Sequence, residues 1–231
     1  MFHVKQSAAP PPPLVAERFF GDHITAAQRY AELLAGPGVE WGLLGPREVD
    51  RLWERHILNS AVTVELLAEH ESVVDIGSGA GLPGIPIAMA RPDLRVVLVE
   101  PMLRRTEFLH LAVRELDLRV EVIRGRADDT GVLSQVGGVD AVVSRAVASL
   151  EKLARWSFPL LRPGGRMLAL KGERAESELD DSRRVLFKLG AEGMRVLRCG
   201  AGYVEPLTTV VVVERSTRSG GGRREHASRR K

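Results

Sequence analysis

The amino-acid sequence predicts an α/β fold whose seven-stranded sheet is parallel except for its last strand. Three observations lead to this prediction. Residues 72–84 pass from a short β-branched strand directly into a glycine-rich turn that precedes a helix. Strand-like and helix-like patterns then alternate as far as residue 190, which is typical of a parallel sheet. The last two strands are joined by so short a connection that they must pair in antiparallel fashion.

Two helical stretches come before the sheet. Apolar residues at three- and four-residue spacing predict a helix that starts at Leu14 and is stopped by the Gly-Pro-Gly sequence at residues 36–38. A second helical stretch follows Pro46 and carries one apolar stripe as far as Leu67. Because both stretches precede the first strand, we expect them to pack beside the sheet and to cover its cofactor end.

The remaining elements follow in order along the chain. The predicted strands are residues 72–76, 95–100, 120–127, 139–144, 166–171, 194–199 and 208–214. The predicted helices between them are residues 82–90, 102–116, 148–161 and 173–190. A turn that contains Gly202 and Pro206 joins the last two strands.

The two ends of the chain differ in composition from its body. Residues 1–13 are predicted to be a flexible leader interrupted by four consecutive prolines, residues 14–70 the N-terminal helices, and residues 71–214 the sheet domain. Residues 215–231 hold seven basic residues and one acidic residue, which leaves 26 basic and 29 acidic residues in the rest of the chain. This Gly/Ser/Arg tail has the composition of a disordered segment. Two interpretations of it remain open: it binds RNA phosphates, or it is a solvated end with no partner.

The composition also restricts the location and the chemistry. The single cysteine, Cys199, excludes an internal disulfide and any metal site built from several cysteines, and we predict no metal. No apolar run approaches the length of a membrane span, and the N-terminus lacks the apolar core of a signal peptide. We therefore expect a cytoplasmic protein that does not contact a membrane.

The glycine-rich turn is the predicted cofactor loop. Gly79-x-Gly81-x-x-Gly84 formally matches the dinucleotide fingerprint, which would indicate NAD. However, Asp75 lies inside the strand, where its carboxylate would repel a pyrophosphate but suit the ammonium and sulfonium groups of S-adenosylmethionine. Gly77-x-Gly79-x-Gly81 also resembles the E/D-x-G-x-G-x-G loop of class I methyltransferases, whose Rossmann-like sheet likewise ends in an antiparallel strand. We therefore predict S-adenosylmethionine as the cofactor, held by Asp75, Gly77 and Gly79.

Glu100 is the candidate for the ribose of this cofactor. It closes the second strand, 19 residues after Gly81, where an acid can accept hydrogen bonds from both ribose hydroxyls. The alternative is an acid at a strand end that binds no ligand.

Four further polar residues have two interpretations each. Asp128, with the amide beside it, would meet an adenine ring, or it caps a helix. Arg145 ends the fourth strand at the ligand-binding edge of the sheet, or it forms a structural ion pair with Asp128 or Glu100. His56 and Asn59 face the site, or they belong to a helix surface on which the histidine is hydrogen-bonded.

Several separated motifs together resemble one family. They are Arg-His-Ile-Leu-Asn-Ser (55–60), Val-Asp-Ile-Gly-Ser-Gly-Ala-Gly-Leu-Pro-Gly (74–84), Glu100 with Arg104-Arg105, Phe108-Leu109, Arg126-Ala127-Asp128, Ser-Arg-Ala-Val-Ala-Ser-Leu (144–150) and Lys171-Gly172. The chain is similar over residues 14–214 to the small-subunit ribosomal RNA methyltransferase G family, also called glucose-inhibited division protein B.

The resemblance implies methylation of guanine N7 in the decoding-centre loop of 16S rRNA, with S-adenosylmethionine as donor and the small ribosomal subunit as partner. The family's cofactor contacts fall on Gly77, Leu82, Ala127, Asp128 and Arg145. Two positions depart from the family pattern: Asn59 stands where an aspartate is common, and Asp128 where a glutamate is. The tail after residue 214 lies outside the pattern.

The chemistry that is implied needs no general base, because guanine N7 carries a lone pair and no proton. We therefore name no catalytic residue, and we treat Arg145, His56 and Asn59 as candidate positioning residues of a monomeric enzyme. Two other functions remain open. One is a class I methyltransferase that acts on a small molecule, and the other is a nucleotide-binding or RNA-binding module without catalysis.

Overall fold

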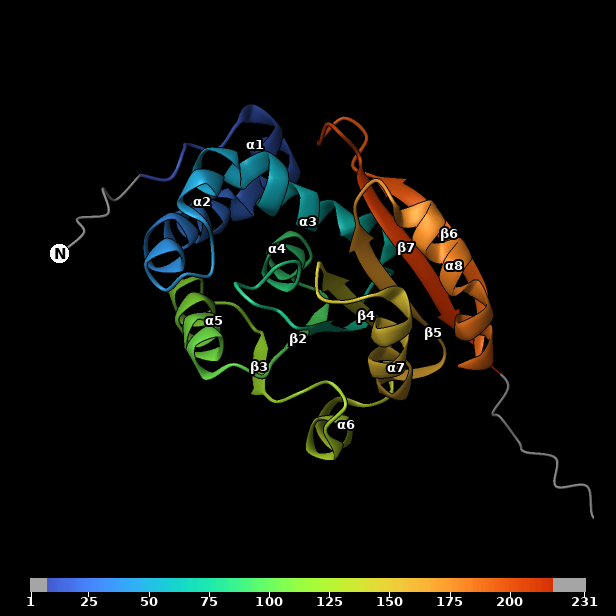
Figure 1. The fold of residues 1–231 in the computed structure, drawn as a ribbon. Helices are drawn as coiled ribbons and strands as arrows, with labels where there is room; N and C mark the ends of the chain where they lie inside the picture. Colours follow the sequence, from blue (N-terminus) through green and yellow to red (C-terminus); the bar gives the residue numbers. More distant parts are fainter. Residues whose placement is uncertain (1–7, 218–231) are drawn as a thin grey trace, which may run out of the picture.

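A computed structural model of the chain describes residues 8–217 (Figure 1). The described residues form one sheet with the strand order β3-β2-β1-β4-β5-β7-β6. The strands are β1 (Ser72–Ile76), β2 (Arg95–Glu100), β3 (Glu121–Arg124), β4 (Val139–Arg145), β5 (Leu161–Lys171), β6 (Ala191–Cys199) and β7 (Thr208–Arg215).

The directions of the strands confirm the predicted fold class. The strands β1, β2, β3, β4 and β5 pair in parallel, whereas β7 runs antiparallel to both β5 and β6. The strand order reverses direction between β1 and β4, and both strands end at the same edge of the sheet. A ligand site is expected at that edge, beside this reversal.

Helices cover both faces of the sheet. They are α4 (Gly84–Ala90), α5 (Leu103–Glu115), α6 (Thr130–Val136), α7 (Leu150–Leu160) and α8 (Ala175–Lys188). Strand side chains alternate between two buried clusters, so that Val73 packs toward α4 and α5 while Val74 packs toward α6, α7 and α8. Figure 1 shows α4 and α5 beside the N-terminal helices and α7 and α8 on the other side of the strands.

The N-terminal segment winds through several short helices of different pitch. They are α1 (Leu14–Phe20), η1 (Gly21–His23), α2 (Ile24–Leu33), η2 (Leu34–Gly38), η3 (Pro46–Arg51), η4 (Leu52–Leu58), α3 (Asn59–Ala61) and η5 (Val62–Leu66). The predicted stop at residues 36–38 is wrong, because the chain continues through it as the wide π-turn of η2. In the second stretch a 3₁₀ segment, η3, is followed by a π-helix, η4, instead of one regular helix.

Three other elements differ from the predicted pattern. The helix α6 was not predicted, because seven residues are too few to show a helical period. The strand β3 is shorter than predicted. The strand β5 begins at Leu161, before the Pro-Gly-Gly sequence that indicated a turn, and its pairing with β4 shifts register there.

The ends of the described region are attached to the fold. Of the predicted leader, residues 8–13 lie against the helices, and the indole nitrogen of Trp53 donates a hydrogen bond to the Pro10 carbonyl oxygen (2.9 Å). Of the predicted tail, Arg215 still belongs to β7, and its guanidinium donates hydrogen bonds to the carbonyl oxygens of Phe158 and Leu161. Residues 1–7 and 218–231 lie outside the described residues. Within residues 8–217 no helix is long and apolar enough to cross a membrane.

Candidate cofactor-binding site

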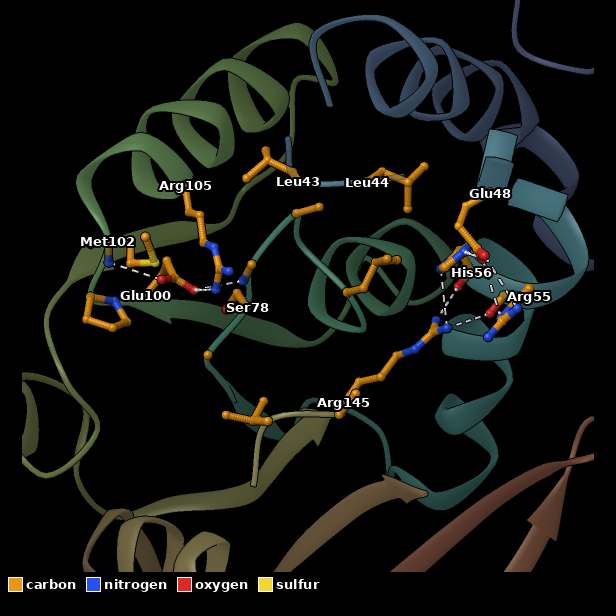
Figure 2. Close-up of a pocket in the computed structure, with 17 residues that line it drawn as sticks. Leu43, Leu44, Glu48, Arg55, His56, Ser78, Glu100, Met102, Arg105 and Arg145 are labelled. Atoms are coloured by element: carbon orange, nitrogen blue, oxygen red, sulfur yellow. Dashed lines mark hydrogen bonds and ion pairs between the residues drawn. The ribbon is translucent and has the colours of Figure 1, made fainter. Parts of the chain in front are cut away.

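A cavity of about 710 Å³ lies at the carboxyl ends of β1, β2 and β4, where the strand order reverses (Figure 2). The glycine loop after β1 and the end of β2 form one wall, and the segment 43–56 of the N-terminal extension forms the opposite wall. Its charged and ionisable lining residues are Glu48, Arg55, His56, Glu100, Arg105 and Arg145. The N-terminal helices therefore cover this edge of the sheet.

The glycine loop after β1 is held in place by its own backbone conformation and by a contact with α2. Gly77 has a φ of +69° and Gly81 a φ of +95°, which other residues adopt only at a cost. A Cβ on Gly81 would also lie 2.4 Å from Cδ1 of Ile85 and 3.1 Å from the hydroxyl of Tyr30. That hydroxyl donates a 2.7 Å hydrogen bond to the Ala80 carbonyl oxygen, and Tyr30 is fully buried. The helix α2 thus fixes the loop that lines the cavity.

Glu100 organises one end of the cavity. Its carboxylate accepts hydrogen bonds from the amides of Gly79 (2.9 Å) and Met102 (3.0 Å), and Arg105 lies 3.8 Å away. The residue is only 1% exposed yet lines the cavity. Each carboxylate oxygen has a second lone pair, so both can still accept a ligand hydroxyl. The loop after β1 and the start of α5 are therefore fastened to the same acid that would hold a ribose.

A narrow slot of about 90 Å³ continues the cavity past Glu100. The two share the lining residues Gly77, Pro101 and Val147, and the slot is completed mainly by apolar groups, including Trp156. Ala127 and Asp128 line this slot, and their position beside an adenine ring stays a prediction. The alternative helix-cap role of Asp128 is not supported, because Asp129 occupies the N-cap position of α6 and Asp128 pairs with Arg126 at 3.0 Å.

The opposite end of the cavity is built around Arg145. Its guanidinium donates to the carbonyl oxygens of Arg55 (2.7 Å) and His56 (3.2 Å) and to the Ser60 hydroxyl (2.9 Å). The alternative ion pair with Asp128 or Glu100 is not formed. Figure 2 shows the side chain reaching from β4 toward His56 and away from Glu100. Arg145 therefore joins the sheet to the last turns of η4.

His56 lies between this guanidinium and a carboxylate. Its Nε2 is 2.8 Å from Glu48, and its Nδ1 is 3.3 Å from the guanidinium of Arg145. Since arginine only donates, Nδ1 accepts, and Nε2 carries the proton that is shared with Glu48. Burial, together with the neighbouring Arg145, lowers the pKa of His56 despite the opposing effect of Glu48. The histidine is thus a neutral link between Glu48 and Arg145, and not a bystander on a helix surface.

Asp75 does not line the cavity that was predicted for it. Its side chain is fully buried beneath the loop, where one oxygen accepts the amide of Gly84 (3.0 Å) and the other has no partner among the described residues. Burial raises the pKa of Asp75 to about 7, and Glu100 adds to this shift. Asp75 therefore supports the loop, without direct access to a ligand.

Sequence comparisons with known proteins show the family of the chain. A profile of rRNA small subunit methyltransferase G matches residues 23–207. The chain belongs to this family. It is 58% identical over 226 residues to the ribosomal RNA small subunit methyltransferase G of Mycolicibacterium gilvum, with 96% of this chain and 100% of the relative covered. It is 62% identical to the protein of the same name from Mycobacterium marinum, with 90% and 92% covered.

A solved structure shows the same fold at low identity. It is a putative S-adenosylmethionine-dependent methyltransferase from Methanococcus maripaludis, with a TM-score of 0.54, 13% identity, and 86% of this chain and 95% of that chain covered. The seven-stranded sheet with an antiparallel last strand is thus a fold that methyltransferases use, as predicted.

The positions that are carried over from the methyltransferase G family fall in two places. Gly77, Leu82 and Arg145 line the cavity, whereas Ala127 and Asp128 line the slot that continues it. Asn59, one of the two departures from the family pattern, lies elsewhere. Its amide nitrogen donates to the hydroxyl of Thr208 (2.8 Å), and the side chain lines a separate groove. Asn59 is therefore not placed to touch a donor in the cavity.

Sequence reasoning missed two residues that build this site, Glu48 and Tyr30. A regular α-helix would separate residues 48 and 56 by about 12 Å along its axis. The helix breaks at Arg51, between η3 and η4, where φ is −112° and ψ is 13°. This break brings Glu48 and His56 together, and no sequence pattern predicts the break. Tyr30 sits in the predicted apolar stripe, so its hydroxyl carried no separate signal. Among the described residues, no three His, Cys, Asp or Glu side chains are grouped so that they could hold a metal ion.

Proposed function

We propose that this protein transfers the methyl group of S-adenosylmethionine to N7 of a guanine in the decoding-centre loop of 16S rRNA. Membership of the rRNA small subunit methyltransferase G family over most of the chain supports the acceptor. The observation that carries the proposal is the position of Glu100, which lines the cavity and accepts the amide of Gly79, while its chain neighbours Val99 and Pro101 line the apolar slot.

The residues fit the donor from one end to the other. The slot beside Ala127 would take the flat adenine ring, and Glu100 the two ribose hydroxyls. The amino-acid part would lie in the wider cavity, within reach of the backbone of Gly77 and Leu82. A Cβ on Gly77 would lie 3.0 Å from the side chain of Val147 and would narrow the passage between slot and cavity.

S-adenosylmethionine would supply a methyl group bound to a positively charged sulfur. Guanine N7 can attack that methyl carbon with its in-plane lone pair; the carbon–sulfur bond breaks, its electrons stay on sulfur, and the positive charge passes to the base. No proton leaves, so the protein needs no general base. Its contribution is to hold the two reactants close and in line, which can supply several kcal/mol.

Arg145 and His56 serve as positioning residues in this account. A guanidinium would repel a methylated guanine cation, and Arg145 is already committed to the carbonyl oxygens of η4. It therefore holds the wall of the cavity in place, with His56 and Glu48 behind it. Asp75 lies below the loop with its pKa raised to about 7, and a cationic donor bound above it would favour the ionised carboxylate.

The experiment is a methyl-transfer assay with isotope-labelled donor. We expect the full-length protein to label small ribosomal subunits from cells that lack this enzyme, and not subunits that are already methylated. Labelling of small molecules alone would indicate the small-molecule alternative, and donor binding without turnover would indicate a binding module. Either result would contradict the proposal.

We further propose that the enzyme acts as a monomer in the cytoplasm, where its substrate is assembled. A mass of two chains by light scattering would contradict the monomeric state.

A further inference from the structure

A second cavity lies beside the first at the same edge of the sheet. It is the groove that Asn59 lines, and it is called the groove below. It measures about 590 Å³ and is lined by η4, the end of β5, the end of β6 and the turn that leads into β7. Because β5 and β6 run parallel to each other and antiparallel to β7, their ends and the start of β7 meet at the edge where the glycine loop also lies. Ligands of open α/β sheets bind along this edge.

One residue belongs to both cavities. Arg55 lines the donor cavity and the second groove, and its side chain is half exposed. Its backbone is fixed, because Arg145 donates to its carbonyl oxygen at 2.7 Å. The last turn of η4 therefore separates the two cavities. An RNA strand that lies in the second cavity can reach the first one, which would hold the donor, by passing Arg55.

Of the eight charged side chains that line the groove, Arg51, Glu54, Arg55 and Lys171 form ion pairs, and the other four form none with the described residues. The guanidinium of Arg198 has no hydrogen-bond or ion-pair partner within residues 8–217, and the same holds for the carboxylates of Glu173, Glu176 and Glu205. All four side chains are exposed. Unpaired donors and acceptors thus face the same space.

The balance of charge indicates what the groove accepts. Its lining holds four basic and four acidic side chains. A track for successive phosphates would be predominantly basic. A mixture of guanidinium donors and carboxylate acceptors instead matches the edges of an unpaired base, which present both kinds of group and also stack on arginine planes.

We propose that this groove receives an unpaired nucleotide of the RNA that neighbours the methylated one, with Arg198 against its base and Arg55 at the crossing to the donor cavity. The inference rests on the proposed function, since it presumes an RNA acceptor. It assigns to the β6–β7 end of the sheet the task of placing the RNA strand, while the donor occupies the β1–β2 end.

Arg198→Ala tests the inference against a matched control on the same strand. Arg195 is also exposed on β6, but it does not line the groove and pairs with Glu214 at 2.6 Å. With undermethylated small subunits as substrate, Arg198→Ala should raise the KM for subunits about tenfold, the loss that is typical of one base contact. Arg195→Ala should change it less than twofold, and the donor Kd should be unchanged in both variants, which also shows that both are folded.

The salt dependence separates a base contact from a phosphate contact. Loss of a phosphate contact reduces the log–log salt slope by about one, whereas loss of a base contact leaves it nearly unchanged. We expect the slope of Arg198→Ala to equal that of the unsubstituted protein. Equal KM values for the two variants would overturn the groove assignment, and a slope reduced by about one would overturn the base assignment.

A crosslinking experiment locates the RNA independently of activity. A decoding-loop RNA that carries 4-thiouridine beside the target guanine should crosslink to peptides containing residues 171–176, 198 or 205–209. Crosslinks confined to other segments would refute the inference. If the unsubstituted protein methylates small subunits but these tests fail, the groove proposal alone is wrong; if it methylates no RNA, the proposed function is wrong.

Discussion

The hydroxyl of Tyr30 donates a 2.7 Å hydrogen bond to the carbonyl oxygen of Ala80, and both groups are buried. This bond joins α2 of the N-terminal extension to the glycine loop, although the two residues are 50 positions apart. The extension is therefore a structural part of the cofactor site and not a separate appendage.

Tyr30→Phe should remove this bond and leave the Ala80 carbonyl buried without a partner. We expect the free energy of unfolding in urea to fall by about 1–3 kcal/mol, and donor affinity to fall with it because the loop is less well held. Tyr203→Phe is the matched control, since the Tyr203 hydroxyl has no hydrogen-bond partner within residues 8–217. Equal stability and donor affinity in the two variants would contradict the coupling.

Glu100→Ala should weaken donor binding by about tenfold to a hundredfold, because charge-assisted hydrogen bonds worth roughly 1.5–3 kcal/mol are lost. The amides of Gly79 and Met102 also lose their acceptor, so the loop loosens. Calorimetry with S-adenosylmethionine measures the effect, and Glu107→Ala, an exposed acid on α5, serves as the control. An unchanged donor affinity, or tighter binding of NAD than of the donor, would refute the assignment.

Asp75→Asn should change how stability depends on pH. Burial raises the pKa of Asp75 from 3.8 to about 7, so between these values the folded protein holds a proton that the unfolded chain releases. The contribution of Asp75 to stability is therefore complete below about pH 4. It is lost as the pH rises through about 7, by up to about 1.4 kcal/mol of unfolding free energy per pH unit. The asparagine of the variant does not titrate, so only the unsubstituted protein loses this contribution. The difference in unfolding free energy, variant minus unsubstituted protein, should therefore rise as the pH increases across this window. Parallel stability curves would show that Asp75 does not titrate there.

The single-turnover rate at saturating donor and RNA should be nearly flat between about pH 6 and 9. No proton leaves N7, so the methyl transfer itself requires no group to gain or lose a proton. Burial lowers the pKa of His56, which favours its neutral imidazole. His56→Ala should reduce the rate by the same factor at every pH, because Arg145 loses a neighbour and Glu48 loses its partner. A rate that rises with unit slope, and loses that slope in His56→Ala while donor and RNA binding stay intact, would reveal a catalytic base.

The sheet and the loop were predictable because their signals are local. The β-branched run before Gly77, the acid that ends β2 and the short connection into β7 each follow from a few adjacent residues. The register of the strands then brings Glu100 beside Gly79 without further information. Gly77, Gly79 and Glu100 thus lie together at the cavity, and their contact with a cofactor stays a prediction.

The N-terminal wall of the site was not predictable in the same way. The contact between Glu48 and His56 depends on a break between two helices of different pitch, and the bond from Tyr30 to Ala80 depends on tertiary packing. Asp75 shows the converse case. Its sequence position indicated a ligand contact, but the close approach of Gly84 and Leu98 seals it beneath the loop.

The most direct test of the account is to identify the product. Small ribosomal subunits from cells that lack this enzyme are incubated with the full-length protein and S-adenosylmethionine, and the 16S rRNA is digested and analysed by mass spectrometry. The account predicts one new methyl group, on N7 of a guanine in the decoding-centre loop, and its absence with Glu100→Ala at low donor concentration. A methyl group on another atom or another nucleotide, or no RNA methylation at all, would contradict it.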